Sequence, residues 1–366
     1  MRIFLKFVSG YEGQEALFYE SGDLSHYEVL EQDLSSITRS IKYSVDPLQS
    51  RLAVVNIGRM SLEFDASGDG RWFFGSLFQY DRDHLIMIEN TDGDVLWTGF
   101  CKKLTHTKKG TLRVDFNHII DRLDDVYIDG DSDEDRDAVT VESVFDELRE
   151  KLSIWPAAAD ADVSTWPDVY LPGEDRKARD YIGAILISQR HVIIHDSDGN
   201  LALRESVAKT AVADFDDDTQ WVIKDENVIS MQTRDDKEKM FNTIKYTPHN
   251  GQETVYTGSL SQPYLYPANY FYRYGARELD VNLEHLSAAD ALTSAKNIQT
   301  ARIAPVRRCD IDVEIPDIAV EILDTVKLEL NHQSDILLPY WGYFMIRALA
   351  IDLTKQIMRL TLEEIT

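Results

Sequence analysis

Cysteine is almost missing from this sequence. Cys101 and Cys309 are the only two in 366 residues, and each stands in a strand-like context. Two cysteines so far apart cannot supply the paired ligands of a CxxC zinc site, and nothing in their placement demands a disulfide. We therefore expect folding in a reducing compartment, with no metal and no cofactor.

Long hydrophobic runs are also missing. Nowhere do about 18 apolar residues follow one another, so no membrane span is predicted. The opening residues, MRIFLKFVSGYEG, alternate like a strand and lack the apolar core and small-residue cleavage site of a signal peptide. The sequence thus predicts a soluble protein without a visible export signal.

Positive charge is scarce. Thirty-eight Lys and Arg stand against 64 Asp and Glu, giving a formal net charge of −26. Such an excess of negative charge repels a phosphate backbone unless a local basic patch opposes it. The basic runs are short and dispersed, as at Lys102-Lys103, Arg176-Lys177 and Arg307-Arg308. We expect no specific nucleic-acid binding.

Familiar catalytic motifs are absent: the chain has no GxSxG, no HExxH and no GxxxxGK[ST]. His191 and His195 are four residues apart, but in a strand that spacing separates them by roughly 13 Å, too far to share one metal. With 64 carboxylates, some pair falls at glycosidase spacing by chance, so the sequence nominates none. No catalytic or metal-binding residue is predicted.

An acidic segment between residues 124 and 137 imitates the start of a calcium loop through Asp129, Asp131 and Asp133. The imitation fails further on, because Glu134 stands where a turn glycine is needed and Thr140 where a bidentate Glu closes the site. A solvated loop between domains is the favoured interpretation, with weak calcium binding at 129–133 left open.

Short alternating strands are what the sequence holds in abundance. Residues 92–116 read as turn, strand, turn, strand, and period-2 alternation also marks 37–45 and 60–65. The same pattern returns from 307 to the end, where Trp, Gly, a strand, a turn and a second strand weakly repeat the order found at 92–116. Two related β-units are predicted, one at each end of the chain.

Helical periodicity appears between these ends. Thr140 is a natural N-cap for a helix that stops before Pro156, and a second apolar face runs along 178–186. A hairpin follows at 191–206, turning at 198–200. The spacing of Ser287 and Asp290 gives a variant capping box for a third helix.

The predicted fold is therefore mixed β-rich α+β, with two β-barrel-like domains flanking and interleaved with α/β subdomains. The predicted domains are a first β-barrel at 1–128, an α/β subdomain at 129–215, and a second β-barrel at 216–366 with a helical insertion near 287–301.

Aromatic residues gather in one polar stretch, QPYLYPANYFYRYG, from Gln262 to Gly275. Tyrosines are amphipathic and enriched in protein contacts, so this stretch is either an interface or a loop packed on its own domain. The candidate interface residues are Tyr264, Tyr266, Tyr270, Phe271, Tyr272 and Tyr274.

The succession of elements resembles the phage tail hub, or baseplate hub, proteins of contractile-tailed phages and prophages. The matching stretches are SITRSIKYSVDPLQSRLAVVNIGRMSLEF, GDVLWTGFCKKL, ARDYIGAILISQRHVIIHDSDGNLAL, NVISMQTRDDKEKMFNTIKY and GYFMIRALAIDLTKQIMRLTLEE. Together they cover most of the chain. The likeness lies in the general pattern of the sequence, and no single signature residue carries it.

The resemblance implies a non-enzymatic virion protein, made in the host cytoplasm. It implies a homotrimer whose two β-barrel domains per chain build a ring that joins a six-fold tail tube to a three-fold spike or tip and lets DNA pass. The partners implied are the tail tube protein and the central spike or tail-tip proteins. The alternatives are a monomeric receptor-binding or adhesion module and a carbohydrate hydrolase that uses paired carboxylates.

Overall fold

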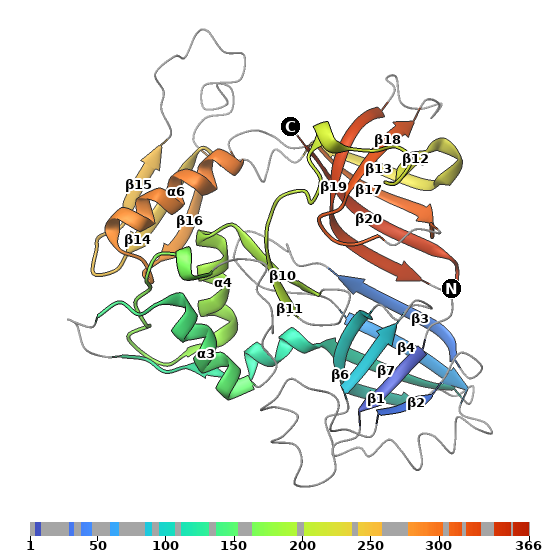
Figure 1. Ribbon diagram of the computed structural model, residues 1–366, viewed down its shortest axis with the longest axis horizontal. Helices are drawn as coiled ribbons and strands as arrows, with labels where there is room; N and C mark the ends of the chain where they lie inside the picture. The colour runs from blue at the N-terminus through green and yellow to red at the C-terminus, as the bar shows by residue number, and fades with distance from the viewer. Residues whose placement is uncertain are drawn as a thin grey trace.

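The computed structural model describes residues 4–8, 29–32, 38–45, 59–65, 85–89, 95–106, 111–131, 137–152, 163–195, 201–235, 241–257, 277–302, 307–316, 320–330, 340–352 and 354–365. Figure 1 shows these residues in three parts: a blue-to-cyan β unit, a yellow-to-red β unit, and a green-and-orange α/β lobe beside them. None of the helices described has the length and apolarity needed to cross a membrane.

The N-terminal β unit is built from the first strands of the chain. They are β1 (Phe4–Val8), β2 (Val29–Gln32), β3 (Thr38–Val45), β4 (Arg59–Asp65), β5 (Leu85–Glu89), β6 (Val95–His106) and β7 (Thr111–His118). Their order in the sheet is β3-β4-β7-β6-β5-β1-β2, with every pair antiparallel. The alternation read from 37–45, 60–65 and 92–116 therefore predicted strands correctly.

The C-terminal β unit is built from β12 (Val222–Lys224), β13 (Val228–Asp235), β17 (Arg307–Glu314), β18 (Thr325–Leu330), β19 (Tyr340–Asp352) and β20 (Ile357–Glu364). Its order is β13-β17-β20-β19-β18-β12. The 3-10 turns η4 (Val212–Asp214) and η5 (Asp225–Asn227) flank β12.

One strand pair joins the two units into a single sheet. The second half of β19 pairs antiparallel with β3, from Leu349 opposite Val45 to Asp352 opposite Lys42. The Lys42 ammonium lies 2.9 Å from the Asp352 carboxylate at the end of this junction. The sheet thus runs continuously through both units and curls within each of them (Figure 1). The prediction of a β-rich α+β fold is confirmed at this level.

The two β units repeat one arrangement of strands. The order β3-β4-β7-β6-β5-β1 corresponds to β13-β17-β20-β19-β18-β12, and the chain visits the corresponding strands in the same succession. The units differ in two ways: β12 runs parallel to β18, whereas β1 runs antiparallel to β5, and among the described strands only β1 has a further partner, β2.

Two β-bulges recur at corresponding places. In the first bulge, the extra residue is Lys102 in β6 and Arg347 in β19. In the second bulge, it is Arg39 in β3 and Ile229 in β13. A bulge bends its strand and re-aims the neighbouring side chains, so equal strand order with equal bulges indicates an internal duplication.

The duplication is also readable in two strand sequences once the register is known. The pairing aligns β4, RMSLEFD, with β17, RCDIDVE, so that Arg59 corresponds to Arg308. Both strands begin with arginine, alternate apolar with polar residues, and carry acids at the fifth and seventh positions. Leu62 and Ile311, at the centre of each strand, are both buried in the hydrophobic core that the two units share.

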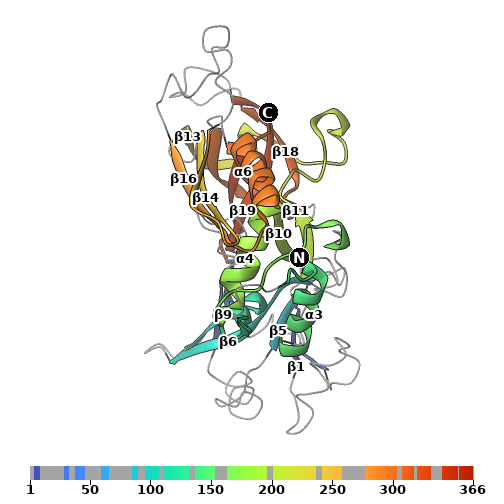
Figure 2. The same ribbon diagram turned by 90° about the vertical axis from the view of Figure 1, so that its left-hand side faces the viewer.

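Among the described residues, the α/β lobe contains three α-helices, two 3-10 helices and seven short strands. They are η2 (Ile119–Asp124), β8 (Tyr127–Ile128), α3 (Val141–Leu152), η3 (Val163–Thr165), β9 (Arg176–Lys177), α4 (Ala178–Ser188), β10 (His191–His195), β11 (Leu201–Glu205), β14 (Thr243–Pro248), β15 (Thr254–Thr257), β16 (Glu278–Leu283) and α6 (Ala288–Arg302). β10 pairs with β11, and β14 lies between β15 and β16 with α6 alongside it (Figure 2).

The predicted helix starts are confirmed in this lobe. The Ser143 amide donates to Thr140 Oγ1 at 3.2 Å at the start of α3, and the Asp290 amide donates to Ser287 Oγ at 3.2 Å at the start of α6. Each bond satisfies a backbone donor that the first turn leaves free.

The lobe has a core of its own. Side chains of α3 and α4 pack with those of β14, β16 and α6 in one buried cluster, which includes Leu148, Ile185, Ile244 and Ala295. β14, β16 and α6 therefore share a core with α3 and α4, although the chain returns to the C-terminal β unit on both sides of them. The division at 128 and 215 stays a prediction.

The chain leaving β11 is fastened to the C-terminal unit. The Lys209 amide donates to the Leu323 carbonyl at 2.8 Å, and the Thr325 hydroxyl donates to the Thr210 carbonyl at 2.6 Å. The Lys209 ammonium also lies 2.9 Å from the carboxylate of Asp324. These bonds attach the lobe to the C-terminal unit at β18.

Candidate assembly surface

The face of the large sheet that points away from the shared core is polar. In β20, Met358, Leu360 and Leu362 are buried in that core, and the residues between them carry charge or hydroxyl groups. Partners lie directly across from one another on neighbouring strands. The cross-strand pairs are Arg359 with Asp312 at 2.6 Å, Lys42 with Asp352 at 2.9 Å, and Thr361 with Asp310 at 2.9 Å.

Most of these pairs are exposed and contribute little stability. The Arg359 side chain is 67% exposed and that of Lys42 is 55% exposed, so solvent screens both attractions. Opposite charges on facing strands nevertheless favour one register over its neighbours, because a slip of one residue would turn the charged side chains of one strand to the other face of the sheet, away from their partners. The polar face therefore specifies pairing more than it stabilises the sheet.

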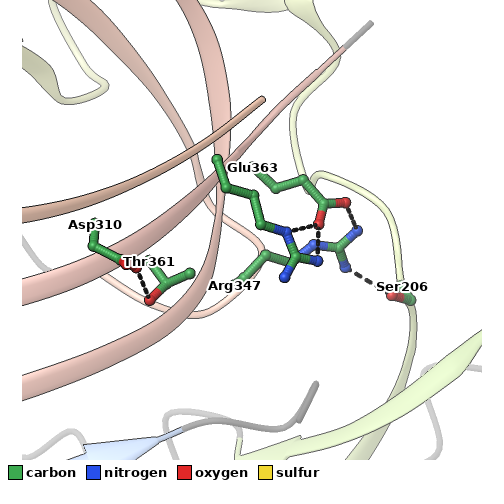
Figure 3. A network of polar contacts seen from close by, with 6 residues as sticks. Ser206, Asp310, Arg347, Thr361 and Glu363 are labelled. Atoms are coloured by element: carbon green, nitrogen blue, oxygen red, sulfur yellow. Dashed lines mark hydrogen bonds and ion pairs between the residues drawn. The ribbon is translucent and has the colours of Figure 1, made fainter. Parts of the chain in front are cut away.

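One group of charges on this face is buried. The Glu363 carboxylate accepts from Arg308 Nη2 at 2.6 Å and from Arg347, and the Arg347 guanidinium also donates to Ser206 Oγ at 2.9 Å (Figure 3). The side chains of Glu363 and Arg347 are only 8% and 12% exposed. Since Ser206 follows β11, this network ties the lobe to the bulge of β19.

A groove of about 680 Å³ lies over the junction of β3 with β19. Seven basic and three acidic side chains line it, against the strongly acidic balance of the whole chain. Three of the lysines have no ion-pair partner within the described ranges: Lys102, Lys103 and Lys355. The sequence showed Lys102-Lys103 as an isolated pair, and the fold brings it beside cations from β3, β4, β7 and β20.

One carboxylate of the groove has a lowered pKa. Asp312 accepts hydrogen bonds from Arg359, which lower its pKa below the ordinary value, and Asp115 accepts from Arg113 at 2.9 Å. A glycosidase needs one carboxylic acid whose pKa is raised so that it can donate a proton. The lowered pKa of Asp312 does not fit that donor.

The two histidines considered in the sequence, His191 and His195, stand at the two ends of the strand β10. His191 lies on β10, where its Nδ1 is 2.6 Å from the Gln189 carbonyl and its ring packs on Trp166 at 4.7 Å. Within the described residues, no three His, Cys, Asp or Glu side chains gather closely enough to hold a metal ion.

The acidic segment is described only in part. Asp129 accepts from Lys151 Nζ at 2.7 Å, while Asp133 and Glu134 lie outside the described residues. The tyrosine-rich stretch, with Tyr264, Tyr266, Tyr270, Phe271, Tyr272 and Tyr274, also lies outside them, so its role as an interface stays a prediction.

Sequence reasoning missed the charged pairs of the polar face. Residues such as Asp312 and Arg359 are 47 positions apart, and a single strand pattern does not reveal which strands are neighbours. The signal that could have found them is the repeated heptapeptide of β4 and β17, which marks corresponding strands in the two units.

This fold, with two repeated β units on one continuous sheet and an α/β lobe beside them, is similar to that of phage or prophage tail proteins of known structure. The 43 kDa tail protein of prophage MuSo2 from Shewanella oneidensis superposes with a TM-score of 0.56 at 13% identity, covering 99% of this chain and 96% of that one. A tail protein from Neisseria meningitidis MC58 gives 0.60 at 12% identity, covering 100% and 97%. Prophage tail protein gp18 from Listeria monocytogenes EGD-e gives 0.51 at 13% identity, covering 99% and 94%.

At these identities the likeness is one of fold. No protein-family model matches the sequence, and no curated protein matches it.

Proposed function

We propose that this chain is a structural subunit of a phage or prophage tail, assembled as a homotrimeric hub. In this role it joins a six-fold tail tube to a three-fold spike or tip and lets DNA pass. The observation that carries the proposal is the fold, which matches those three tail proteins over nearly their whole length.

The internal duplication supports the symmetry of this role. Each chain carries two β units of the same strand order, so three chains supply six similar units. A ring built in this way presents quasi-six-fold symmetry to a tube while remaining three-fold at the level of the chain. The partners in this proposal are a second and third copy, the tail tube protein and the spike or tail-tip proteins, and the location is the virion after assembly in the host cytoplasm.

The same proposal assigns no catalysis to the chain. The groove at the junction holds carboxylates that are paired with arginine or lysine, and Asp312 has a lowered pKa. An enzyme with two catalytic carboxylates needs one of them protonated, which is the opposite arrangement.

The test is the mass of the purified chain by light scattering during size-exclusion chromatography. A mass of three times 41.9 kDa supports the hub. A mass of 41.9 kDa across the accessible concentration range contradicts the trimer and favours the monomeric adhesion module.

A further inference from the structure

The junction inside the chain shows how two β units join. β19 pairs with β18 along its first half, Tyr340 to Met345, and on the same side pairs with β3 along its second half, Leu349 to Asp352. The long strand therefore holds its own unit together with one half and reaches the next unit with the other.

The corresponding strand of the N-terminal unit has the same form without the second partner. β6 pairs with β5 only along its first half, Val95 to Phe100. From Cys101 to His106 its partner among the described strands is β7, on the other side. This leaves the second half of β6 with an open edge in the part of the chain that the structure describes.

A second open edge lies at the other end of the sheet. β13 corresponds to β3, and of the described strands only β17 pairs with it. At its bulge, Ile229 is 52% exposed. Open edges with unpaired backbone groups are templates for another chain, and natural proteins cover them.

We propose that the second half of β6 in one copy pairs antiparallel with β13 of a second copy. This inference rests on the proposed ring and names its interface. Within one chain β6 lies inside the N-terminal unit and β13 at the far end of the C-terminal unit, so they meet only between copies. Each copy then pairs through its β6 edge with one neighbour and through its β13 edge with the other. In a closed ring neither edge is exposed.

The register follows from the duplication. In β6, Thr105 lies opposite Arg113, and in β19 Ala350 lies opposite Arg359, so Thr105 and Ala350 occupy corresponding positions. In β13, Arg234 lies opposite Arg308, and its counterpart in β3 is Ser44, the residue after Tyr43. Since Ala350 pairs with Ser44 in the junction inside the chain, Thr105 should pair with Arg234 of the second copy. The flanking pairs are then Leu104 with Asp235 and His106 with Thr233.

The test is disulfide cross-linking of the full chain with Thr105→Cys and Arg234→Cys in a Cys101→Ser background. Residues directly opposite in antiparallel strands have Cα atoms about 4.5–5.5 Å apart, which a disulfide spans. Oxidation should give covalent dimers and trimers on a non-reducing gel, and each single-cysteine variant should stay monomeric on that gel. The native Cys309 is buried and does not interfere.

Two matched variants calibrate the result. Ser44→Cys with Ala350→Cys is the corresponding pair inside one chain, so it should form an intrachain disulfide without changing the mass. His106→Cys with Arg234→Cys is displaced by one residue, which places the thiols on opposite faces of the sheet, and it should not cross-link.

The outcomes separate the strand pairing from the hub itself. If the mass is trimeric and the 44–350 pair forms its disulfide, but the 105–234 pair does not cross-link, then the proposed strand pairing is wrong. The proposed hub is still supported in that case. Equal cross-linking of the displaced pair also overturns it. A monomeric mass without cross-linking contradicts both.

Discussion

The indole of Trp97 lies directly over Gly99, two residues further along β6. A Cβ atom on Gly99 would lie 2.2 Å from Cη2 of this ring and 2.1 Å from the Asn117 carbonyl oxygen on β7. In the C-terminal unit the large and the small residue exchange places. The register sets Gly342 at the position of Trp97 and Phe344 at the position of Gly99. Both units thus place one aromatic ring over one glycine at this point of the sheet.

This relationship predicts that Gly99→Ala destabilises the protein. One of the two obstacles is backbone of the neighbouring strand, which cannot rotate away, so we expect a loss of about 3 kcal/mol, at the upper end for overpacking. Urea denaturation followed by tryptophan fluorescence measures it. A loss below about 1 kcal/mol would show that the strands separate easily here.

We expect removal of the buried Glu363 carboxylate to lower the free energy of unfolding more than removal of an exposed carboxylate does. Glu363→Gln leaves the charges of Arg308 and Arg347 without their common anion, and breaking such a pair typically costs about 3–5 kcal/mol. The matched control is Asp115→Asn on the same polar face. Its partner Arg113 is 56% exposed, so we expect about 1 kcal/mol or less. Equal free energies of unfolding for the two variants would contradict the prediction.

His285 predicts a dependence of stability on pH. Burial, assisted by the positive charge of Arg176, lowers its pKa from 6.5 to about 3. Between these values the unfolded chain binds a proton that the folded chain does not. Stability should therefore fall as pH falls from 6.5 towards 3, by about 1.4 kcal/mol per pH unit from this group.

The measurement is a series of urea denaturations from pH 7 to pH 4 on the native chain and on His285→Gln. Other groups titrate in both proteins, so the difference between the two slopes isolates the histidine. Parallel slopes would show that folding does not lower the pKa of His285.

We expect the thiol of Cys309 to be unreactive in the folded protein. It is fully buried on β17, and burial raises its pKa to about 12, so at pH 8 it stays protonated and enclosed. In a Cys101→Ser variant, a thiol reagent should react only after unfolding in urea. Rapid reaction of the folded variant would mean that the core opens locally around β17.

Much of the local structure was readable from the sequence. Alternation predicted β3, β4, β6 and β7 and the strands that follow residue 307, and Thr140 and Ser287 marked where α3 and α6 begin. These predictions succeed because strand alternation and helix capping depend on residues within a few positions of one another. The candidate surface was less accessible, since its paired charges come from strands far apart in the sequence.

The sequence by itself determined the element types, the scarcity of motifs for chemistry, the acidic balance and a weak repeat between the two ends. The tertiary structure alone decided that the repeat is a full duplication, that β19 crosses to β3, and that Lys102 and Lys103 lie in a basic groove of an acidic chain. The physical reason is that alternation specifies which face a side chain occupies, whereas the partner of a strand is chosen by backbone hydrogen bonds and packing over separations of more than 300 residues.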